Sequence, residues 1–272
     1  MNRIDQTFEK LKSEGRTAYI PFVTMGDPNL DTSIDILAAL ERAGADIVEL
    51  GVPYSDPLAD GPVIQRASQR ALSNGISIRD IIQSASRARE RGIQLPFILF
   101  TYYNPVLQFG LENFFQALQE HDISGMIIPD LPYEENQEVS ELAETYDIHL
   151  IPLVAPTSKE RITKIASKAK GFVYCVSSLG VTGERSAFHN EIDTFMDTVK
   201  QAAKVPVAVG FGISSREQYE QMAERSDGVI VGSAIVRTIE ENVPLLLNDE
   251  TRQQGLNQIE QFVASLKGES AK

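Results

Sequence analysis

The sequence is poor in the residues that build disulfides, metal sites and membrane spans. Among its 272 residues there are one cysteine and three histidines, and no apolar run approaches the thickness of a bilayer. Cys175 has no partner for a disulfide within the chain, and its place in the run FVYCVS indicates a small core residue. Charged residues interrupt the amino-terminal segment, which argues against a secretory signal. These features favour a reduced, cytoplasmic setting.

Positive charge is also scarce. The chain has 25 Lys and Arg residues against 38 Asp and Glu residues, which gives a formal net charge of −13. Nucleic acids and anionic membranes require a basic surface, so neither is expected as the main partner. An anionic substrate would have to be bound by local groups such as backbone N–H donors.

Eight short apolar runs recur along the chain, separated by amphipathic segments. The runs cover residues 18–24, 46–52, 96–102, 125–130, 149–156, 171–177, 205–212 and 228–234. They are apolar throughout and do not alternate, which is typical of parallel strands covered on both faces. The sequence therefore predicts a strand followed by a helix, eight times.

The intervening segments carry recognisable helix signals. Residues 2–14 place their apolar side chains on one face and predict an extra amino-terminal helix. Other helices are expected to begin at Ser77, after Asn190, and at Ser214, where Glu217 completes the spacing of a capping box.

Eight such units in a chain of this length predict a (β/α)₈ barrel, also called a TIM barrel. It would form a single domain over residues 1–272 with a flexible tail at about 267–272. A doubly wound open sheet is the alternative, but no G-x-G-x-x-G fingerprint follows the first strand. Because the active sites of these barrels form at the carboxyl ends of the strands, residues there are the functional candidates.

Two glycine-containing turns follow the last two predicted strands. GFGISS (210–215) and GSA (232–234) each lead into a helix. Glycine lets backbone N–H groups approach an anion, and the amino terminus of a helix attracts it. These glycines could simply turn the chain, but two such turns on adjacent units favour a phosphate site.

The connection after the sixth predicted strand covers residues 178–190. It is long, contains Gly180 and Gly183, and has few apolar anchors. It is interpreted as a lid that closes beside the phosphate site, with an exposed connector as the alternative.

Metal and Schiff-base chemistry are disfavoured. His121, His149 and His189 are scattered along the chain, so no metal site is predicted. Lys168 and Lys170 precede the sixth strand and would lie at the opposite end of the barrel from the active site.

Carboxylates at strand ends remain as candidates. Glu49 lies among apolar residues of the second strand, where burial should raise its pKa and allow proton transfer near neutrality. It could equally be a buried glutamate that serves stability alone. Asp60 lies just before Pro62, so it could serve only the start of a helix. Asp27 and Asp130 are interpreted as turn residues.

Large apolar side chains also occur near strand ends. Phe22, Leu99, Tyr174 and Phe211 are each expected in the core. Together they could form a planar apolar slot beside the phosphate site.

Eight stretches of the sequence, in this order, resemble the tryptophan synthase alpha subunit family. They are FVTMGDP (22–28), VELGVPYSDPLADGPVIQRA (48–67), LFTYYNP (99–105), IIPDLP (127–132), LVAPTS (153–158), SLGVTGER (178–185), VGFGIS (209–214) and VGSAIV (231–236). The second stretch is the most specific. The similarity extends from the first predicted strand to the eighth.

The resemblance implies a lyase that cleaves indole-3-glycerol phosphate to indole and glyceraldehyde 3-phosphate, a step of tryptophan biosynthesis. The family's catalytic pair falls on Glu49 and Asp60. Glu49 would protonate the ring carbon that bears the side chain, and Asp60 would hold the indole N–H and stabilise the cation. Removal of a glycerol hydroxyl proton would then break the carbon–carbon bond in a retro-aldol sense.

The same resemblance implies binding residues. The phosphate ligands would be Gly183, Gly212, Gly232 and Ser233. The indole contacts would be Phe22, Leu99, Tyr174 and Phe211, and Thr182 in the lid would close towards Asp60. It implies no role for Glu184 and Arg185.

The family works with a separate beta subunit that carries pyridoxal phosphate, so the resemblance implies an alpha2beta2 complex and no cofactor in this chain. Residues 53–56 and 102–105 would face that partner. Two other functions are compatible with the residues. One is a barrel isomerase that acts on another phosphorylated metabolite, and the other is a binding subunit that gates a partner enzyme.

Overall fold

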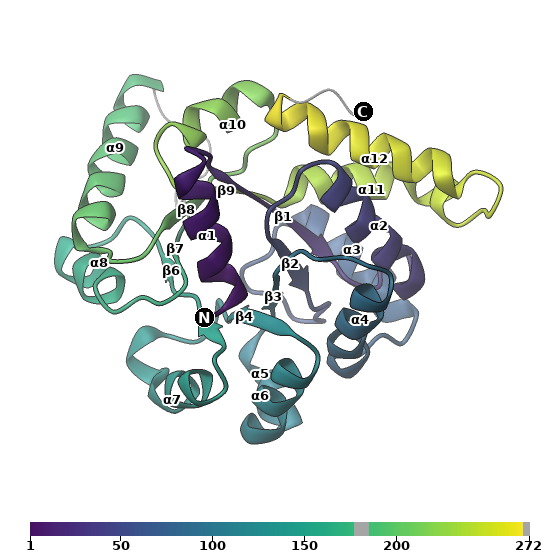
Figure 1. The fold of residues 1–272 in the computed structure, drawn as a ribbon, viewed down its shortest axis with the longest axis horizontal. Coiled ribbons are helices and arrows are strands. Elements are labelled where there is room, and N and C mark those ends of the chain that lie inside the picture. Colours follow the sequence, from purple (N-terminus) through teal and green to yellow (C-terminus); the bar gives the residue numbers. More distant parts are fainter. Residues whose placement is uncertain (177–184, 269–272) are drawn as a thin grey trace.

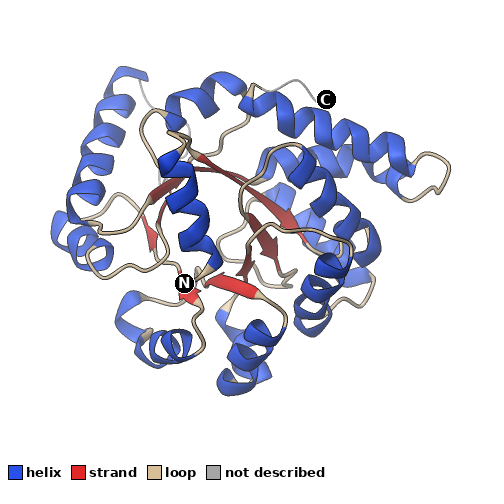
Figure 2. Cartoon of the chain, in the orientation of Figure 1, coloured by secondary structure: helices blue, strands red, loops and turns tan. Residues whose placement is uncertain are grey.

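A computed structural model of the chain describes the backbone of residues 1–176 and 185–268, and the side chains of these ranges except 185–191. Within these ranges nine short parallel strands curl into a barrel that helices surround (Figures 1 and 2). The strands are β1 (Ala18–Thr24), β2 (Val48–Gly51), β3 (Phe97–Phe100), β4 (Ile123–Ile127), β5 (His149–Leu150), β6 (Leu153–Val154), β7 (Val173–Val176), β8 (Val207–Gly210) and β9 (Gly228–Val231).

Helices precede, connect and follow these strands. They are α1 (Arg3–Ser13), α2 (Leu30–Arg42), α3 (Pro62–Ser73), α4 (Ile78–Glu90), α5 (Tyr103–Phe109), α6 (Leu111–Glu120), the short 3₁₀ turn η1 (Tyr133–Glu135), α7 (Gln137–Thr145), α8 (Lys159–Ala166), α9 (Arg185–Ala202), α10 (Arg216–Ala223), α11 (Ser233–Leu246) and α12 (Arg252–Lys267). No helix in the described part of the chain is long and apolar enough to cross a membrane.

The segment predicted as the fifth strand, residues 149–156, forms two strands that close the barrel. In the strand order β5-β4-β3-β2-β1-β9-β8-β7-β6, β5 pairs with β4 and β6 pairs with β7, so one segment supplies both ends. Between them, the Ile151 N–H donates to the Met126 carbonyl at 2.9 Å, and the Pro152 carbonyl accepts from the Tyr174 N–H at 3.0 Å. The predicted barrel is confirmed, with its fifth strand split at a proline that cannot donate to the ladder.

The amino-terminal end of the barrel is filled by side chains from the strands and from α1. Ile4, Phe8 and Leu11 of α1 pack with the inward-facing side chains of the strands, and the ring centroids of Phe8 and Phe172 lie 5.5 Å apart. The predicted amino-terminal helix is thus confirmed, and Figure 1 shows it lying across the barrel. Because this end is packed, space for a ligand remains at the opposite mouth.

Most of the buried apolar residues lie between the strands and the surrounding helices. Tyr19, Val48, Phe97 and Val209 are examples of strand residues that point outwards into this layer. Successive strand residues face opposite sides, and most inward-facing ones, such as Ile20, Ile98 and Ile230, are apolar as well, as the unbroken apolar runs predicted.

The helix ends agree with the sequence in part. Ser77 caps α4 in a capping box with Asp80, as its position predicted. The cap of α10 is Ser215, one residue later than expected, while the Ser214 N–H donates to the Gln218 side chain at 2.9 Å. α9 begins at Arg185, so the expectation of a helix starting after Asn190 was wrong.

Candidate active site

A cavity of about 580 Å³ opens at the carboxyl ends of the strands. Its described lining comes from nearly every side of the barrel: Phe22, Glu49, Ala59, Asp60, Ile64, Phe100, Pro129, Leu153, Ala155, Tyr174, Val176, Gly210, Gly212, Ile213, Ser214, Ile230, Gly232, Ser233, Ala234 and Arg237. It therefore occupies the position where barrel enzymes bind their substrates.

Glu49 reaches this cavity because of its register in β2. Val48 and Leu50 point outwards into the helix-facing core, so Glu49 between them faces the barrel interior. It pairs with Phe22 of β1 on one side and Ile98 of β3 on the other. The carboxyl group is thus held between two apolar neighbours on rigid strands.

The environment of Glu49 favours its neutral form. The residue is 1% exposed, and neither carboxyl oxygen has a hydrogen-bond partner among the described residues. Burial raises the pKa of Glu49 from 4.5 to about 8, because ionisation would place an unpaired charge in an apolar site. A carboxyl with that pKa is mostly protonated at neutral pH and can both give and take a proton.

Asp60 approaches the cavity from the loop between β2 and α3. It lies two residues before Pro62, the first residue of α3, and burial raises its pKa. The Tyr102 hydroxyl opposes this rise by donating a hydrogen bond to the Asp60 carboxylate, and the same hydroxyl accepts from the Ala59 N–H at 3.0 Å. Tyr102 thereby holds the loop and the carboxylate together. The family resemblance implied a beta-subunit contact for residues 102–105 but not this role.

Glycines make room for two of the aromatic rings that line the cavity. A Cβ at Gly51 would lie 2.4 Å from the Phe22 ring, and a Cβ at Gly210 would lie 2.6 Å from the Tyr174 hydroxyl oxygen. Phe22 and Tyr174 both line the cavity. Burial raises the pKa of Tyr174 well above its ordinary value, and the nearby Glu49 raises it further. The phenol therefore stays neutral beside the carboxyl group.

Two predicted wall residues need correction. Leu99 packs in the helix-facing core, and its neighbour Phe100 lines the cavity instead, because alternate residues of β3 face opposite sides. Phe211 is half-buried against that same core, with its ring centroid 6.5 Å from that of Phe195 in α9, and is absent from the described lining. The lining at this point comes from Gly210 and Gly212, the residues on either side of it.

The two glycine turns meet at the cavity, as their positions predicted. Gly212 adopts a φ of +68°, a conformation that favours glycine, and a Cβ there would meet no atom within 4 Å. Gly232 precedes α11, and the N–H groups of the first turn of α11 donate to no capping side chain among the described residues. The backbone N–H groups of this first turn, near Ser233 and Ala234, are therefore available to an anion in the cavity.

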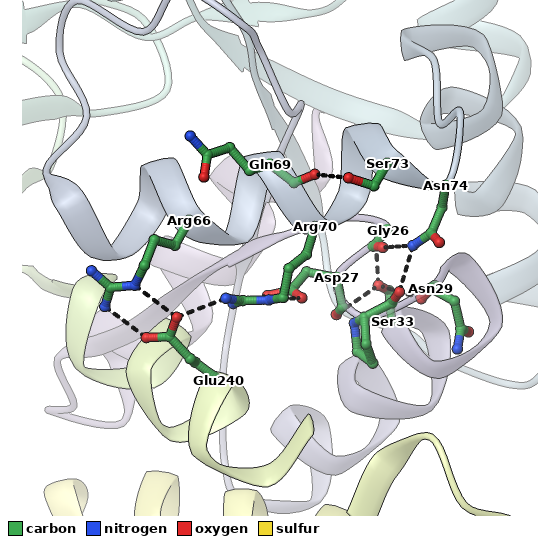
Figure 3. A network of polar contacts seen from close by, with 11 residues as sticks. Gly26, Asp27, Asn29, Ser33, Arg66, Gln69, Arg70, Ser73, Asn74 and Glu240 are labelled. Carbon is green, nitrogen blue, oxygen red and sulfur yellow. Dashed lines mark hydrogen bonds and ion pairs between the residues drawn. The ribbon is translucent and has the colours of Figure 1, made fainter. Parts of the chain in front are cut away.

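An ion-pair network supports the two helices that begin at the site (Figure 3). Arg70 of α3 donates to both oxygens of Asp27 and also to Glu240 of α11, which Arg66 contacts as well. Asp27 is thus an anchored charge at the end of β1, a role beyond the predicted turn. The network links the helix that follows Asp60 to the helix that begins at Ser233.

Other candidates lie away from the cavity or outside the described residues. His149 contacts Asp5 and His121 contacts Ser86, and the part of the chain that the structure describes contains no cluster of three or more possible metal ligands. Thr182 and Gly183, predicted as lid and phosphate contacts, lie outside the described residues.

The fold and the cavity place the chain among the (β/α)₈-barrel enzymes. The sequence profile of the family described as tryptophan synthase alpha chain matches residues 8–270. The tryptophan synthase alpha chain of Bacillus pumilus (strain SAFR-032) is 54% identical over 249 residues, which cover 92% of this chain and 93% of the relative. The chain therefore belongs to the tryptophan synthase alpha chain family.

Solved structures give the same grouping. Tryptophan synthase subunit alpha from Legionella pneumophila str. Paris has a TM-score of 0.84 and 37% identity, with 97% of this chain and 98% of that chain covered. A ligand-free tryptophan synthase structure from M. tuberculosis has a TM-score of 0.83 and 32% identity, with 98% of this chain and 99% of that chain covered.

Proposed function

We propose that this chain is the carbon–carbon lyase of its family, which cleaves indole-3-glycerol phosphate to indole and glyceraldehyde 3-phosphate in tryptophan biosynthesis. The observation that carries the proposal is the buried carboxyl of Glu49, which has no hydrogen-bond partner among the described residues and lies in a cavity whose other side is formed by glycine turns. Protonation of an aromatic ring needs an acid that is neutral near pH 7, and the pKa of about 8 at Glu49 provides one.

Glu49 would protonate the ring carbon that carries the glycerol phosphate chain. The indole then becomes a cation, and Asp60 would stabilise it by accepting a hydrogen bond from the ring N–H. Glu49, now ionised, or a group linked to it would remove the proton of the adjacent glycerol hydroxyl. The carbon–carbon bond breaks, its electron pair returns to the ring, and indole and the aldehyde leave.

The remaining lining would position the substrate for this step. Phe22, Phe100 and Tyr174 provide apolar surface that suits a planar ring. The backbone N–H groups near Gly212, Gly232 and Ser233 would bind the phosphate, which lets an acidic protein hold a dianion. Thr182 and Gly183 remain proposed contacts of the same site.

The electron sink in this mechanism is the indole ring itself, so the chain would need no cofactor of its own. Pyridoxal phosphate would belong to a separate beta subunit, and the two chains would assemble as alpha2beta2 in the cytoplasm. A surface that suits this partner lies beside the cavity mouth. Leu58 is 87% exposed there, and the ring of Tyr54 stacks on that of Tyr102 at 4.9 Å. Size-exclusion chromatography with the cognate beta subunit tests the assembly.

Turnover of the purified chain tests the lyase assignment. Mixed with indole-3-glycerol phosphate, the wild-type chain should release indole, and Glu49→Gln should lower kcat by at least about 10³-fold, because the amide cannot transfer the proton. Asp130→Asn is a matched control, since Asp130 is an exposed strand-end carboxylate outside the cavity lining that binds the Tyr103 N–H at 2.9 Å. Undiminished turnover in Glu49→Gln would remove Glu49 from the mechanism.

A further inference from the structure

Arg237 differs from the other arginines of this acidic protein. Every other arginine side chain that the structure describes makes an ion pair with a carboxylate or packs over an aromatic ring. Arg237 makes neither contact with the described residues and lines the cavity instead. With 38 acidic residues in the chain, a charge without a carboxylate partner at this place indicates that its partner comes from elsewhere.

The helix that carries Arg237 offers it two possible partners, and neither is used. Glu240 and Glu241 follow at the i+3 and i+4 positions, where a helix normally forms ion pairs. Glu240 is bound by Arg66 at 2.7 Å and by Arg70 at 2.7 Å, as Figure 3 shows, and these contacts lower its pKa to about 2. No ion pair joins Arg237 to Glu241 among the described residues. The network on α11 therefore leaves Arg237 without an ion-pair partner in the described part of the chain.

The position of Arg237 directs it towards the proposed phosphate site. It lies four residues after Ser233, so both occupy one face of α11 and Arg237 is one turn further along. Side chains of a helix tilt towards its amino terminus, which brings the guanidinium back towards Ser233 and Gly232. Among the described lining residues it is the only cationic side chain.

We propose that Arg237 is a further binding residue for the substrate phosphate, adding a charged, hydrogen-bonding side chain to the backbone N–H groups. This inference rests on the proposed function, since it assigns a role within the same site. A guanidinium matches phosphate oxygens in a bidentate manner, and its charge attracts a dianion towards a protein that otherwise repels it. Arg237 would therefore contribute to substrate capture and not to the chemical step.

Binding to the full-length chain tests this role by calorimetric titration with glycerol 3-phosphate and, separately, with indole. Arg237→Gln should weaken glycerol 3-phosphate binding about fivefold, the upper end of the effect of one exposed charge pair, and leave indole binding within about twofold. Arg237→Lys should recover part of the loss, because lysine restores the positive charge but not the bidentate geometry of the guanidinium. Arg252→Gln is a control of equal charge change, since Arg252 pairs with Asp249 at 2.5 Å on the turn into α12.

Steady-state kinetics distinguish an effect on substrate binding from an effect on the chemical step. In Arg237→Gln the KM for indole-3-glycerol phosphate should rise by a similar factor with kcat within about twofold, and kcat/KM should become less sensitive to salt. Unchanged glycerol 3-phosphate binding in Arg237→Gln, or an equal loss of indole binding, would overturn the inference while the lyase assignment stands. A wild-type chain that releases no indole and binds no glycerol 3-phosphate would overturn both.

Discussion

Arg70 donates hydrogen bonds to both carboxylate oxygens of Asp27, each at 2.8 Å. Asp27 is 2% exposed, and burial raises its pKa even beside the guanidinium, so removal from water outweighs the attraction of Arg70. The pair joins the end of β1 to α3, and Glu240 extends it to α11. The elements that carry Asp60 and Ser233 are therefore held in one frame.

Replacing Arg70 by methionine should destabilise the fold by roughly 3–5 kcal/mol, because it leaves the buried carboxylate of Asp27 without its partner. Urea unfolding at pH 7 measures this loss. Arg66→Met is the matched control: Arg66 also pairs with Glu240, but its side chain is 49% exposed and its loss should cost less than about 1 kcal/mol.

The double variant Asp27→Asn, Arg70→Met tests the explanation for that loss. It removes the buried charge together with its partner and should recover much of the stability. A loss in Arg70→Met of the same size as in Arg66→Met would show that Asp27 does not depend on the pair.

The barrel could be predicted from the sequence because apolar runs report burial on both faces of a strand. The split of residues 149–156 could not, since the run is equally apolar whether it pairs with one neighbour or changes partner at Pro152. Run length indicates that a strand exists, whereas pairing is decided by closure of the whole sheet. The start of α9 was missed for a related reason, because residues 185–190 lack an apolar stripe that would mark them as helical.

Within the site, residue type was easier to predict than the face of the strand. Glu49 could be recognised because a carboxylate interrupts apolar neighbours, but Leu99 and Phe100 are both apolar and only the register decides which one faces the cavity. Arg237 was missed because an arginine in a helix is ordinary in sequence. Its distinguishing feature is the lack of a described carboxylate partner, which depends on contacts between α3 and α11.

Tyr102 should set the ionisation of Asp60. Its hydroxyl donates to that carboxylate and lowers the pKa of Asp60, while burial raises the pKa of Tyr102 and keeps the hydroxyl protonated as a donor. Tyr102→Phe removes the hydrogen bond, so the pKa of Asp60 should rise. If ionised Asp60 stabilises the indole cation, the acidic limb of kcat/KM should move to higher pH, with a loss of roughly three- to tenfold near pH 6.

The pH profile of indole release measures that shift. Tyr103→Phe is the control, because Tyr103 is the adjacent tyrosine and is absent from the described cavity lining. An acidic limb at the same pH in Tyr102→Phe and wild type would mean that Asp60 does not need to be ionised, or that Tyr102 does not control it.

Glu49 should make the stability of the folded chain depend on pH above the range where most carboxylates titrate. Its pKa is about 8 when folded and near 4.5 when unfolded, so the folded state binds the proton more tightly. The stabilisation is complete below pH 4.5 and is lost as the pH rises to about 8, where the folded state must also ionise. The free energy of unfolding of wild type, relative to Glu49→Gln, should fall by roughly 3–5 kcal/mol over this range and then level off.

Denaturant unfolding from pH 5 to 9 at constant ionic strength measures the difference, and Asp130→Asn should follow the wild-type curve. Parallel curves for wild type and Glu49→Gln would show that Glu49 ionises normally in the folded chain and is not held neutral for proton transfer.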